Sequence, residues 1–164
     1  RQRAGSAYEA AGMLRQVQKR WPAQLGAPPA LAPQQGARTP FADGEFDIAT
    51  VSAVLHHVPM AERPAVYAEL GRVLKPGGRL YVFEHNPRNP LVRYVVAHTA
   101  IDRNAILLDA TEVRHGLLNA ARYDLDTDYL MFMPPGLALL RPVDRALAWL
   151  PLGAQYVVAA HKPG

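Results

Sequence analysis

The chain has 164 residues, of which 49% are hydrophobic and 20% are charged. These proportions are typical of a folded globular protein, and the length predicts a single domain over 1–164. Because the sequence contains no cysteine, it excludes disulfide scaffolds, thiolate zinc sites and cysteine nucleophiles.

The net charge of +4 is concentrated near the start of the chain. Residues 1–38 hold six basic residues against the single acid Glu9, and the rest of the chain is close to neutral. A nucleic-acid-binding surface is usually a basic stripe interleaved with aromatic residues, whereas only Trp21 accompanies this basic segment. We therefore expect no nucleic-acid partner.

No segment has the composition of a signal peptide or a membrane span. The most apolar later stretch, 129–140, is interrupted by Pro134 and Pro135 and is shorter than the roughly 20 residues that cross a bilayer. The expected location is the cytoplasm, and the sequence does not indicate an oligomeric state.

The first part of the chain contains one predicted helix. Residues 1–9 are expected to be a disordered or remnant N-terminus, and 10–20 has the apolar spacing of an amphipathic helix that Pro22 ends. The Pro- and Ala-rich stretch 23–35 predicts an irregular connection to the rest of the chain.

The middle of the chain predicts a strand, a helix and a second strand. Residues 46–55 are apolar and rich in β-branched residues, as in a parallel strand covered on both faces. Residues 61–74 have a helical period and end at a Lys-Pro-Gly-Gly turn, and 79–84 again read as a strand. This order predicts a βαβ unit with parallel strands.

The last part of the chain predicts two helices and two strands. A helix is expected over 111–121, with Thr111 as its N-cap, and a strand over 129–133. A short helix over 143–150 and a closing strand over 154–160 follow. The alternation of helices and strands predicts an α/β sandwich with a partly parallel sheet.

Polar residues follow both strands of the βαβ unit. The first strand ends at His56-His57, and the second ends at Glu84-His85-Asn86. Because ligands bind at the carboxyl ends of strands in open α/β sheets, we expect these side chains to form one site with tuned pKa values. In the alternative reading, a histidine caps a helix or packs on apolar neighbours and Glu84 is solvated.

Several familiar sites are excluded by missing motifs. The sequence contains no phosphate-binding loop, no nucleotide-binding glycine fingerprint, no serine elbow and no His-Glu-x-x-His pair. A metal site is not expected, because adjacent histidines at the end of a strand do not easily point at one ion.

Three sequence blocks carry a resemblance to a known family. They are PFADGEFD at 40–47, VLHHVP at 54–59 and ELGRVLKPGGRLYVFEHNP at 69–87. The chain resembles the class I S-adenosylmethionine-dependent methyltransferases, in particular the type 11 or UbiE-like group. A looser likeness runs from Met13 to the C-terminus.

The resemblance implies a Rossmann-like three-layer sandwich. Its sheet would have the order 3-2-1-4-5-7-6, mostly parallel with an antiparallel last strand, and 46–55, 79–84, 129–133 and 154–160 would be strands 4, 5, 6 and 7. Strand 1 and the glycine-rich loop after it have no counterpart in the sequence. The chain is therefore interpreted as an N-terminally truncated methyltransferase.

The resemblance also implies a cofactor, S-adenosylmethionine, and the residues that would bind it. The family's ribose-binding acid is matched only by Glu9, one position out of register, and its adenine-binding position by the amide of Gln35. The complete set of expected cofactor-binding residues is Glu9, Gln35, Gly36, Ala37, Val51, Ser52 and Ala53.

The implied reaction is methyl transfer to a small, partly apolar acceptor. His57 and His85 are the expected catalytic bases, since an imidazole can take a proton near neutral pH. The segment 86–109, which mixes basic and apolar residues, is expected to cover the acceptor or to contain a core-packing helix. The alternatives are a catalytically silent methyltransferase-like fragment that serves in association and, less favoured, a nicotinamide oxidoreductase.

Overall fold

The computed structural model of the chain defines residues 36–102, 104–133 and 141–164. Contacts divide the chain into two compact units, residues 1–40 and 41–164. The expected N-terminal remnant 1–9, the helix 10–20 and the connection 23–35 lie outside the described residues. All elements named below belong to the second unit.

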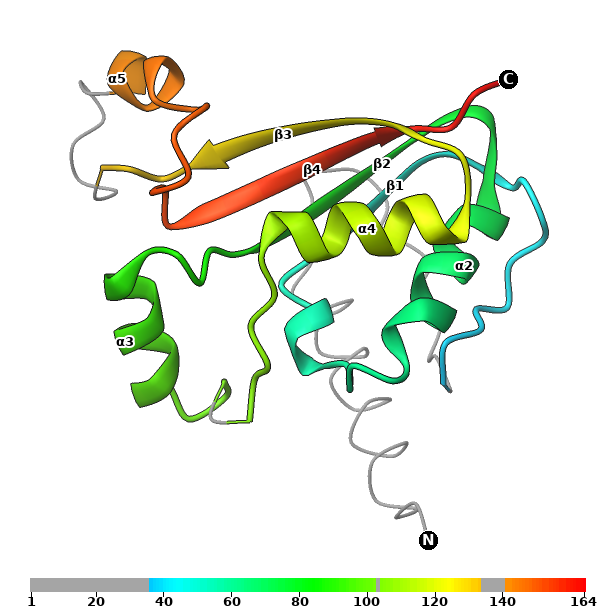
Figure 1. Ribbon diagram of the computed structural model, residues 1–164. Coiled ribbons are helices and arrows are strands. Elements are labelled where there is room, and N and C mark those ends of the chain that lie inside the picture. The colour runs from blue at the N-terminus through cyan, green and yellow to red at the C-terminus, as the bar shows by residue number, and fades with distance from the viewer. Residues whose placement is uncertain (1–35, 103, 134–140) are drawn as a thin grey trace, which may run out of the picture. The chain divides into compact units, whose positions relative to one another are not determined.

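Four strands form one mixed sheet in the order β1-β2-β4-β3 (Figure 1). They are β1 (Phe46–Ser52), β2 (Leu74–His85), β3 (Asp124–Leu130) and β4 (Gln155–His161). β1 and β2 are parallel, whereas β4 runs antiparallel to both of its neighbours. This arrangement is the 4-5-7-6 part of the predicted sheet, with its antiparallel last strand.

The described helices lie between and beside these strands. They are the 3-10 helix η2 (Leu55–His57) and the α-helices α2 (Arg63–Val73), α3 (Pro90–His98), α4 (Ala110–Ala120) and α5 (Arg141–Ala146). α2 and α4 pack together and cover one face of the sheet (Figure 1). The described residues thus supply two of the three expected layers. None of their helices is long and apolar enough to cross a bilayer.

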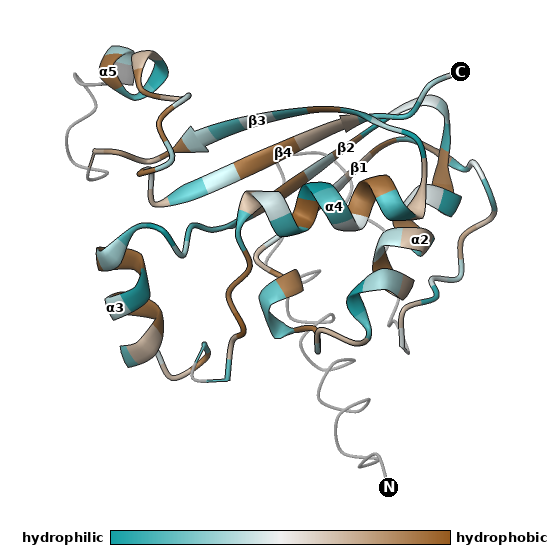
Figure 2. Cartoon of the chain, in the orientation of Figure 1, coloured by the Kyte–Doolittle hydropathy of each residue, from teal (hydrophilic) through white to brown (hydrophobic). Residues whose placement is uncertain are grey.

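The core lies between the sheet and the pair α2 and α4. Alternate residues of β2 and β4 point into it, and Figure 2 shows the hydrophobic middle of β4 above α4. Burial of these apolar side chains is the main favourable contribution to folding. The fully buried members include Leu80, Val82, Val113, Leu117, Tyr156 and Val158.

β1 differs from the predicted strand over 46–55. It ends at Ser52, because Ala53 adopts a left-handed backbone with φ of 52°. Among the described strands β1 lies at the edge of the sheet, and its Ile48 is 59% exposed, so the prediction of a strand covered on both faces does not hold there.

The predicted Lys-Pro-Gly-Gly turn is a bulge within β2, so this strand begins at Leu74 instead of residue 79. Phe46 pairs with Leu74 and Ile48 pairs with Arg79, so that residues 75–78 bulge out of the ladder. Gly77 has a φ of 77°, which favours glycine, and its N–H donates to the carbonyl of Lys162 at 2.9 Å. The bulge therefore links the start of β2 to the end of the chain.

Two other predicted boundaries were wrong. β3 occupies 124–130 instead of 129–133. The prediction missed its first half because exposed aspartates alternate there with partly buried residues, which gives a weak strand signal. The N-cap of α4 is Asp109 instead of Thr111, and its Oδ1 accepts a hydrogen bond from the N–H of Glu112 at 3.0 Å.

Candidate functional site

The ends of β1 and β2 meet at one edge of the sheet, as predicted. Ser52 pairs with Phe83, and the N–H of Ala53 donates to the carbonyl of Phe83 at 2.9 Å. The chain then turns into η2, which carries His56 and His57. The polar residues after the two strands therefore lie side by side.

Glu84 is the centre of this cluster. Its side chain is fully buried, and Oε1 accepts hydrogen bonds from the N–H groups of Val54 and Leu55 at 3.0 and 2.7 Å. Oε2 lies 2.6 Å from Nδ1 of His56. Because Glu84 is buried and both of its oxygens have hydrogen-bond partners, the alternative reading of Glu84 as a solvated acid is wrong.

His56 and His57 converge on a third residue that the sequence analysis missed. Nε2 of His56 lies 3.0 Å from Nε2 of His57. Oδ1 of Asp102 lies 3.5 Å from the first of these nitrogens and 3.4 Å from the second. The three atoms form a compact triangle.

His56 and His57 lie in η2 and not at the end of a strand, where the expectation of no metal site had placed them. Side chains of neighbouring strand residues point to opposite faces, whereas η2 turns the backbone between them. Their ring centroids are 4.2 Å apart, so the two imidazoles do point at one place. That geometric reason for excluding a metal therefore fails.

Arg63 holds the segment that carries Asp102 against η2. Its buried guanidinium donates to the carbonyls of Val58 at 3.1 Å and Ile106 at 2.6 Å, and it also pairs with Glu112. The N–H of Ile106 in turn donates to the carbonyl of His56 at 2.8 Å. These bonds tie together three segments that are far apart in the sequence, which is why no local motif revealed Arg63 or Asp102.

A cavity of about 520 Å³ adjoins this cluster. Its walls come from α3, from residues 131–133 and from the start of β4, and both His85 and Asp102 line it. Most of the other lining side chains are apolar, a composition typical of small-molecule pockets. They include Leu91, Val92, Val95, Val96, Met131 and Phe132.

Of the two predicted bases, only His85 lines this cavity. The His57 side chain is 41% exposed and reaches the cavity wall through its contact with Asp102. Asn86, the last residue of the predicted polar cluster, is buried and joins the end of β2 to the turn before β4. Its Nδ2 donates to the carbonyls of Pro151 and Gly153 at 3.2 and 2.8 Å, which is a structural role.

The predicted cofactor-binding residues divide into three groups. Val51, Ser52 and Ala53 lie at the carboxyl end of β1, beside the histidine cluster. Gly36, which has a φ of 69°, and Ala37 belong to the first compact unit. Glu9 and Gln35 lie outside the described residues.

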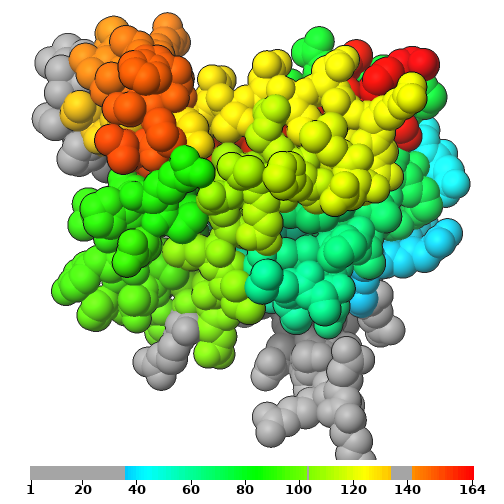
Figure 3. All heavy atoms as spheres, in the orientation of Figure 1, coloured from blue at the N-terminus to red at the C-terminus, as the bar shows by residue number. Residues whose placement is uncertain are grey.

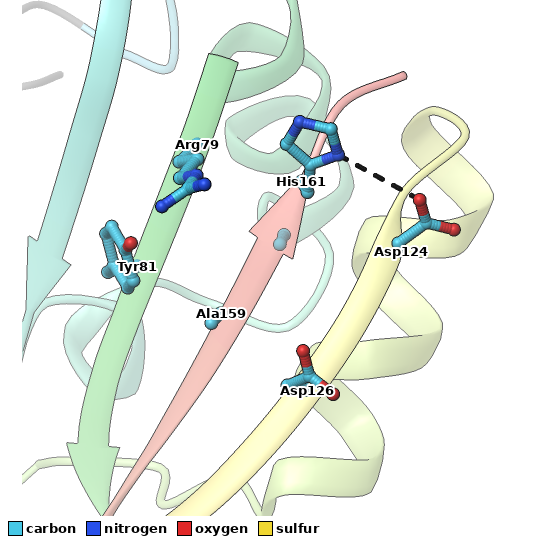
Figure 4. A pocket seen from close by; sticks show the side chains of 7 residues that line it. Arg79, Tyr81, Asp124, Asp126, Ala159 and His161 are labelled. Atoms are coloured by element: carbon cyan, nitrogen blue, oxygen red, sulfur yellow. Dashed lines mark ion pairs between the residues drawn. The ribbon is translucent and has the colours of Figure 1, made fainter. Parts of the chain in front are cut away.

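A second hollow of about 350 Å³ lies at the other end of the strands (Figure 4). Arg79 and Tyr81 from β2, Asp124 and Asp126 from β3 and His161 from β4 surround it. His161 pairs with Asp124 at 3.9 Å, and both side chains are largely exposed. Ligands of open α/β sheets bind at the opposite, carboxyl end of the parallel strands, so this hollow is not the candidate site.

Part of the chain is similar to known methyltransferases. Residues 10–82 match the family model of a methyltransferase domain. A 2-phytyl-1,4-naphtoquinone methyltransferase of Synechococcus elongatus is 46% identical over 55 residues, which are 33% of this chain and 23% of that protein. A demethylmenaquinone methyltransferase of a Parafrankia species is 52% identical over 54 residues, which are 33% of this chain and 20% of that protein.

A solved structure supports the fold over a longer stretch. An S-adenosylmethionine-dependent methyltransferase from Thermotoga maritima superposes with a TM-score of 0.60 at 18% identity, covering 77% of this chain and 60% of that one. The chain therefore matches less than a quarter of the length of these curated relatives. Sequence and fold thus agree in what the chain resembles: residues 10–82 match a methyltransferase domain, and the described strands and helices have the fold of S-adenosylmethionine-dependent methyltransferases.

Proposed function

We propose that the complete protein transfers a methyl group from S-adenosylmethionine to a small, partly apolar acceptor that binds in the 520 Å³ cavity. The observation that carries this proposal is the position of that cavity. It lies at the carboxyl end of β2, next to the histidine cluster that follows β1, and ligands of this fold class bind at this edge. Its polar lining residues are His85, Asn89, Asp102 and Gln155.

The cofactor side of the site is proposed at the carboxyl end of β1. Ser52 is exposed there, and the left-handed backbone of Ala53 ends the strand at this point. The family resemblance also implies Glu9, Gln35, Gly36 and Ala37, which belong to the other compact unit, as cofactor-binding residues. When bound, S-adenosylmethionine supplies a methyl group that is already activated by its sulfonium.

The acceptor side requires orientation and, for some acceptors, removal of a proton. Apolar walls exclude water and hold the acceptor, which accounts for much of the rate in this kind of displacement. The methyl carbon forms a bond to the acceptor atom, and the carbon–sulfur bond breaks with its electron pair remaining on sulfur. Any proton lost by the acceptor is taken up by His85, or by His57 next to Asp102.

An aromatic ring with an apolar substituent is the acceptor class that the cavity and the relatives jointly favour. The two curated relatives are named for quinone substrates. The apolar lining from α3 and residues 131–133 suits such a ring, and the polar wall suits its oxygen atoms. A small quinol is therefore the first acceptor to test.

The test measures binding and turnover with the full-length protein. Titration calorimetry is expected to show micromolar binding of S-adenosylmethionine, and His85→Ala is expected to lower kcat by about 100-fold or more. His161→Ala, at the far end of β4, is the matched control and should leave kcat unchanged. A kcat within about threefold of wild type for both His85→Ala and His57→Ala would disprove the base assignment.

The second candidate is a catalytically silent methyltransferase-like domain that serves in association. It is favoured by exposed apolar side chains on and after α3: Leu91, Tyr94 and Ile101 are 68%, 63% and 82% exposed. Figure 3 shows this segment at the surface of the described chain. Absence of S-adenosylmethionine binding at millimolar concentration would favour this function over methyl transfer.

A further inference from the structure

Three potential metal ligands come together beside the acceptor cavity. Nε2 of His56, Nε2 of His57 and Oδ1 of Asp102 are separated by 3.0, 3.5 and 3.4 Å. Atoms that share one zinc-like ion at bond lengths of about 2.0–2.2 Å lie roughly 3.0–3.5 Å from one another. The spacing is therefore that of three ligands of a single ion. Among the described residues these three form the one such group.

The hydrogen bond between His56 and Glu84 determines that the lone pair of His56 is on Nε2, the atom that faces His57 and Asp102. A carboxylate offers only acceptors, so Nδ1 of His56 is assigned as the donor to Oε2 of Glu84 at 2.6 Å. In a neutral imidazole the lone pair is then on Nε2, which faces His57 and Asp102.

When both imidazoles are neutral, hydrogen bonds cannot pair Nε2 of His56, Nε2 of His57 and Oδ1 of Asp102 all at once. The single N–H of a neutral His57 can point at the lone pair of His56 or at the carboxylate of Asp102, but not fully at both. One acceptor then faces another acceptor in a partly buried place, which is unfavourable. One cation receives all three electron pairs at once.

The surroundings of His56 match those of a metal-binding histidine. Such a histidine usually donates its other ring N–H to a carboxylate, which fixes the orientation of the ring. Glu84 does this for His56, and both side chains are buried to 1% exposure or less. Arg63 and Ile106 hold the segment that carries Asp102 in place.

We propose that His56, His57 and Asp102 bind one divalent transition-metal ion of the zinc type. Two imidazole nitrogens and one carboxylate oxygen are a donor set that suits such ions and leaves at least one coordination position open. Because Asp102 also lines the cavity, an oxygen atom of the acceptor would take that position. This last step rests on the proposed function, whereas the metal site itself does not.

Metal binding changes the role of His57. With Nε2 bound to the ion, its Nδ1 carries the proton and the ring does not act as a base. His85, whose ring centroid lies 5.2 Å from that of His56, is then the remaining base of the cluster.

The test uses full-length protein without a histidine tag, freed of metal with a chelator. Calorimetry with Zn²⁺ is expected to show one equivalent bound, and Co²⁺ is expected to give the visible absorption bands of a low-coordinate nitrogen and oxygen site. His57→Gln and Asp102→Asn, which replace partly exposed side chains, each remove a proposed direct ligand. Each should weaken Zn²⁺ binding by more than about 10-fold, the smallest loss typical of an outer-shell partner. His115→Ala, an exposed histidine on α4, is the matched control and should bind as wild type does.

Two results would overturn the metal site. One is the absence of Zn²⁺ and Co²⁺ binding at millimolar concentration, and the other is binding that both His57→Gln and Asp102→Asn leave unchanged. Because neither S-adenosylmethionine nor an acceptor is present, these results would not affect the proposed methyl transfer. Conversely, if the protein transferred no methyl group, the expected Zn²⁺ binding would be unchanged.

Discussion

Oε2 of Glu84 lies 2.6 Å from Nδ1 of His56, although the two residues are 28 positions apart in the sequence. The parallel pairing of β1 with β2 brings them together, because both strands end at the same edge of the sheet. Glu84 also accepts two backbone N–H groups from the turn that carries the histidines. One buried carboxylate thus fixes the conformation of this turn.

Replacement of this carboxylate should destabilise the fold. In Glu84→Gln the side-chain amide can still accept from the backbone, but its NH₂ group would face the N–H of His56. We expect a loss of about 1–3 kcal/mol in the free energy of unfolding, measured by urea denaturation. Glu62→Gln, at an exposed position, is the control and should change it by less than about 0.5 kcal/mol.

Replacement of Arg63 by lysine should lower the free energy of unfolding more than the same replacement at an exposed arginine. Its guanidinium joins two loop carbonyls and Glu112 in three directions, and a lysine offers no such planar fork. Because Glu112 is 41% exposed, we expect Arg63→Lys to cost about 1–3 kcal/mol, less than a fully buried pair would. Equal unfolding midpoints for Arg63→Lys and the exposed-site control Arg93→Lys would contradict this role.

Gly116 permits the close contact of α4 with α2. A Cβ atom at this position would lie 2.2 Å from Cε2 of Tyr67, inside the van der Waals contact distance. Alanine normally stabilises a helix relative to glycine by about 1 kcal/mol, but here we expect Gly116→Ala to destabilise by about 1–3 kcal/mol. The sign of the change, measured by thermal unfolding, is the test.

A second substitution separates steric overlap from other effects of Gly116→Ala. Tyr67→Leu removes the ring, so the cost of Gly116→Ala should fall in that background. Asn119→Ala, at an exposed position of α4, should be neutral or slightly stabilising. An equal cost of Gly116→Ala in both backgrounds would rule out the contact with Tyr67 as its cause.

Two buried tyrosines should respond differently to loss of the hydroxyl group. The hydroxyl of Tyr67 has no hydrogen-bond partner within the described chain, whereas that of Tyr156 donates to the carbonyl of Leu108 at 2.9 Å. We therefore expect Tyr67→Phe to be neutral or stabilising and Tyr156→Phe to cost about 0.5–1.5 kcal/mol. Each variant lacks one hydroxyl oxygen, so their free energies of unfolding from chemical denaturation can be compared directly.

The hydroxyl of Tyr67 should also contribute to the loss of stability at alkaline pH. Burial, followed by the nearby charge of Glu112, raises the pKa of Tyr67 from 10.0 to about 12. The folded state keeps its proton where the unfolded state has lost it, so stability should fall as the pH rises from 10 to 12. Tyr67→Phe should reduce this slope, measured by denaturation across that pH range together with tyrosinate absorbance. An unchanged slope would show that Tyr67 is not responsible.

The sequence predicted the main elements well where the signal is local. The apolar run of β1, the helical period of α2 and the Lys-Pro-Gly-Gly bulge each reflect backbone preferences and burial within a few residues. β3 was misplaced because its aspartates alternate along a strand with one exposed face. A half-exposed strand of this kind has a weak signal in a single sequence.

For the site, the sequence by itself determined that polar residues follow two parallel strands and that these residues meet at one edge. That follows from the geometry of a βαβ unit. Only the tertiary structure decided that Asp102 and Arg63 belong to the same cluster. The first lies in the loop after α3 and the second begins α2, and they reach the cluster through contacts that no local spacing encodes. It also decided that His56 and His57 point at one place, since the left-handed turn at Ala53 replaces the strand end with a 3-10 helix.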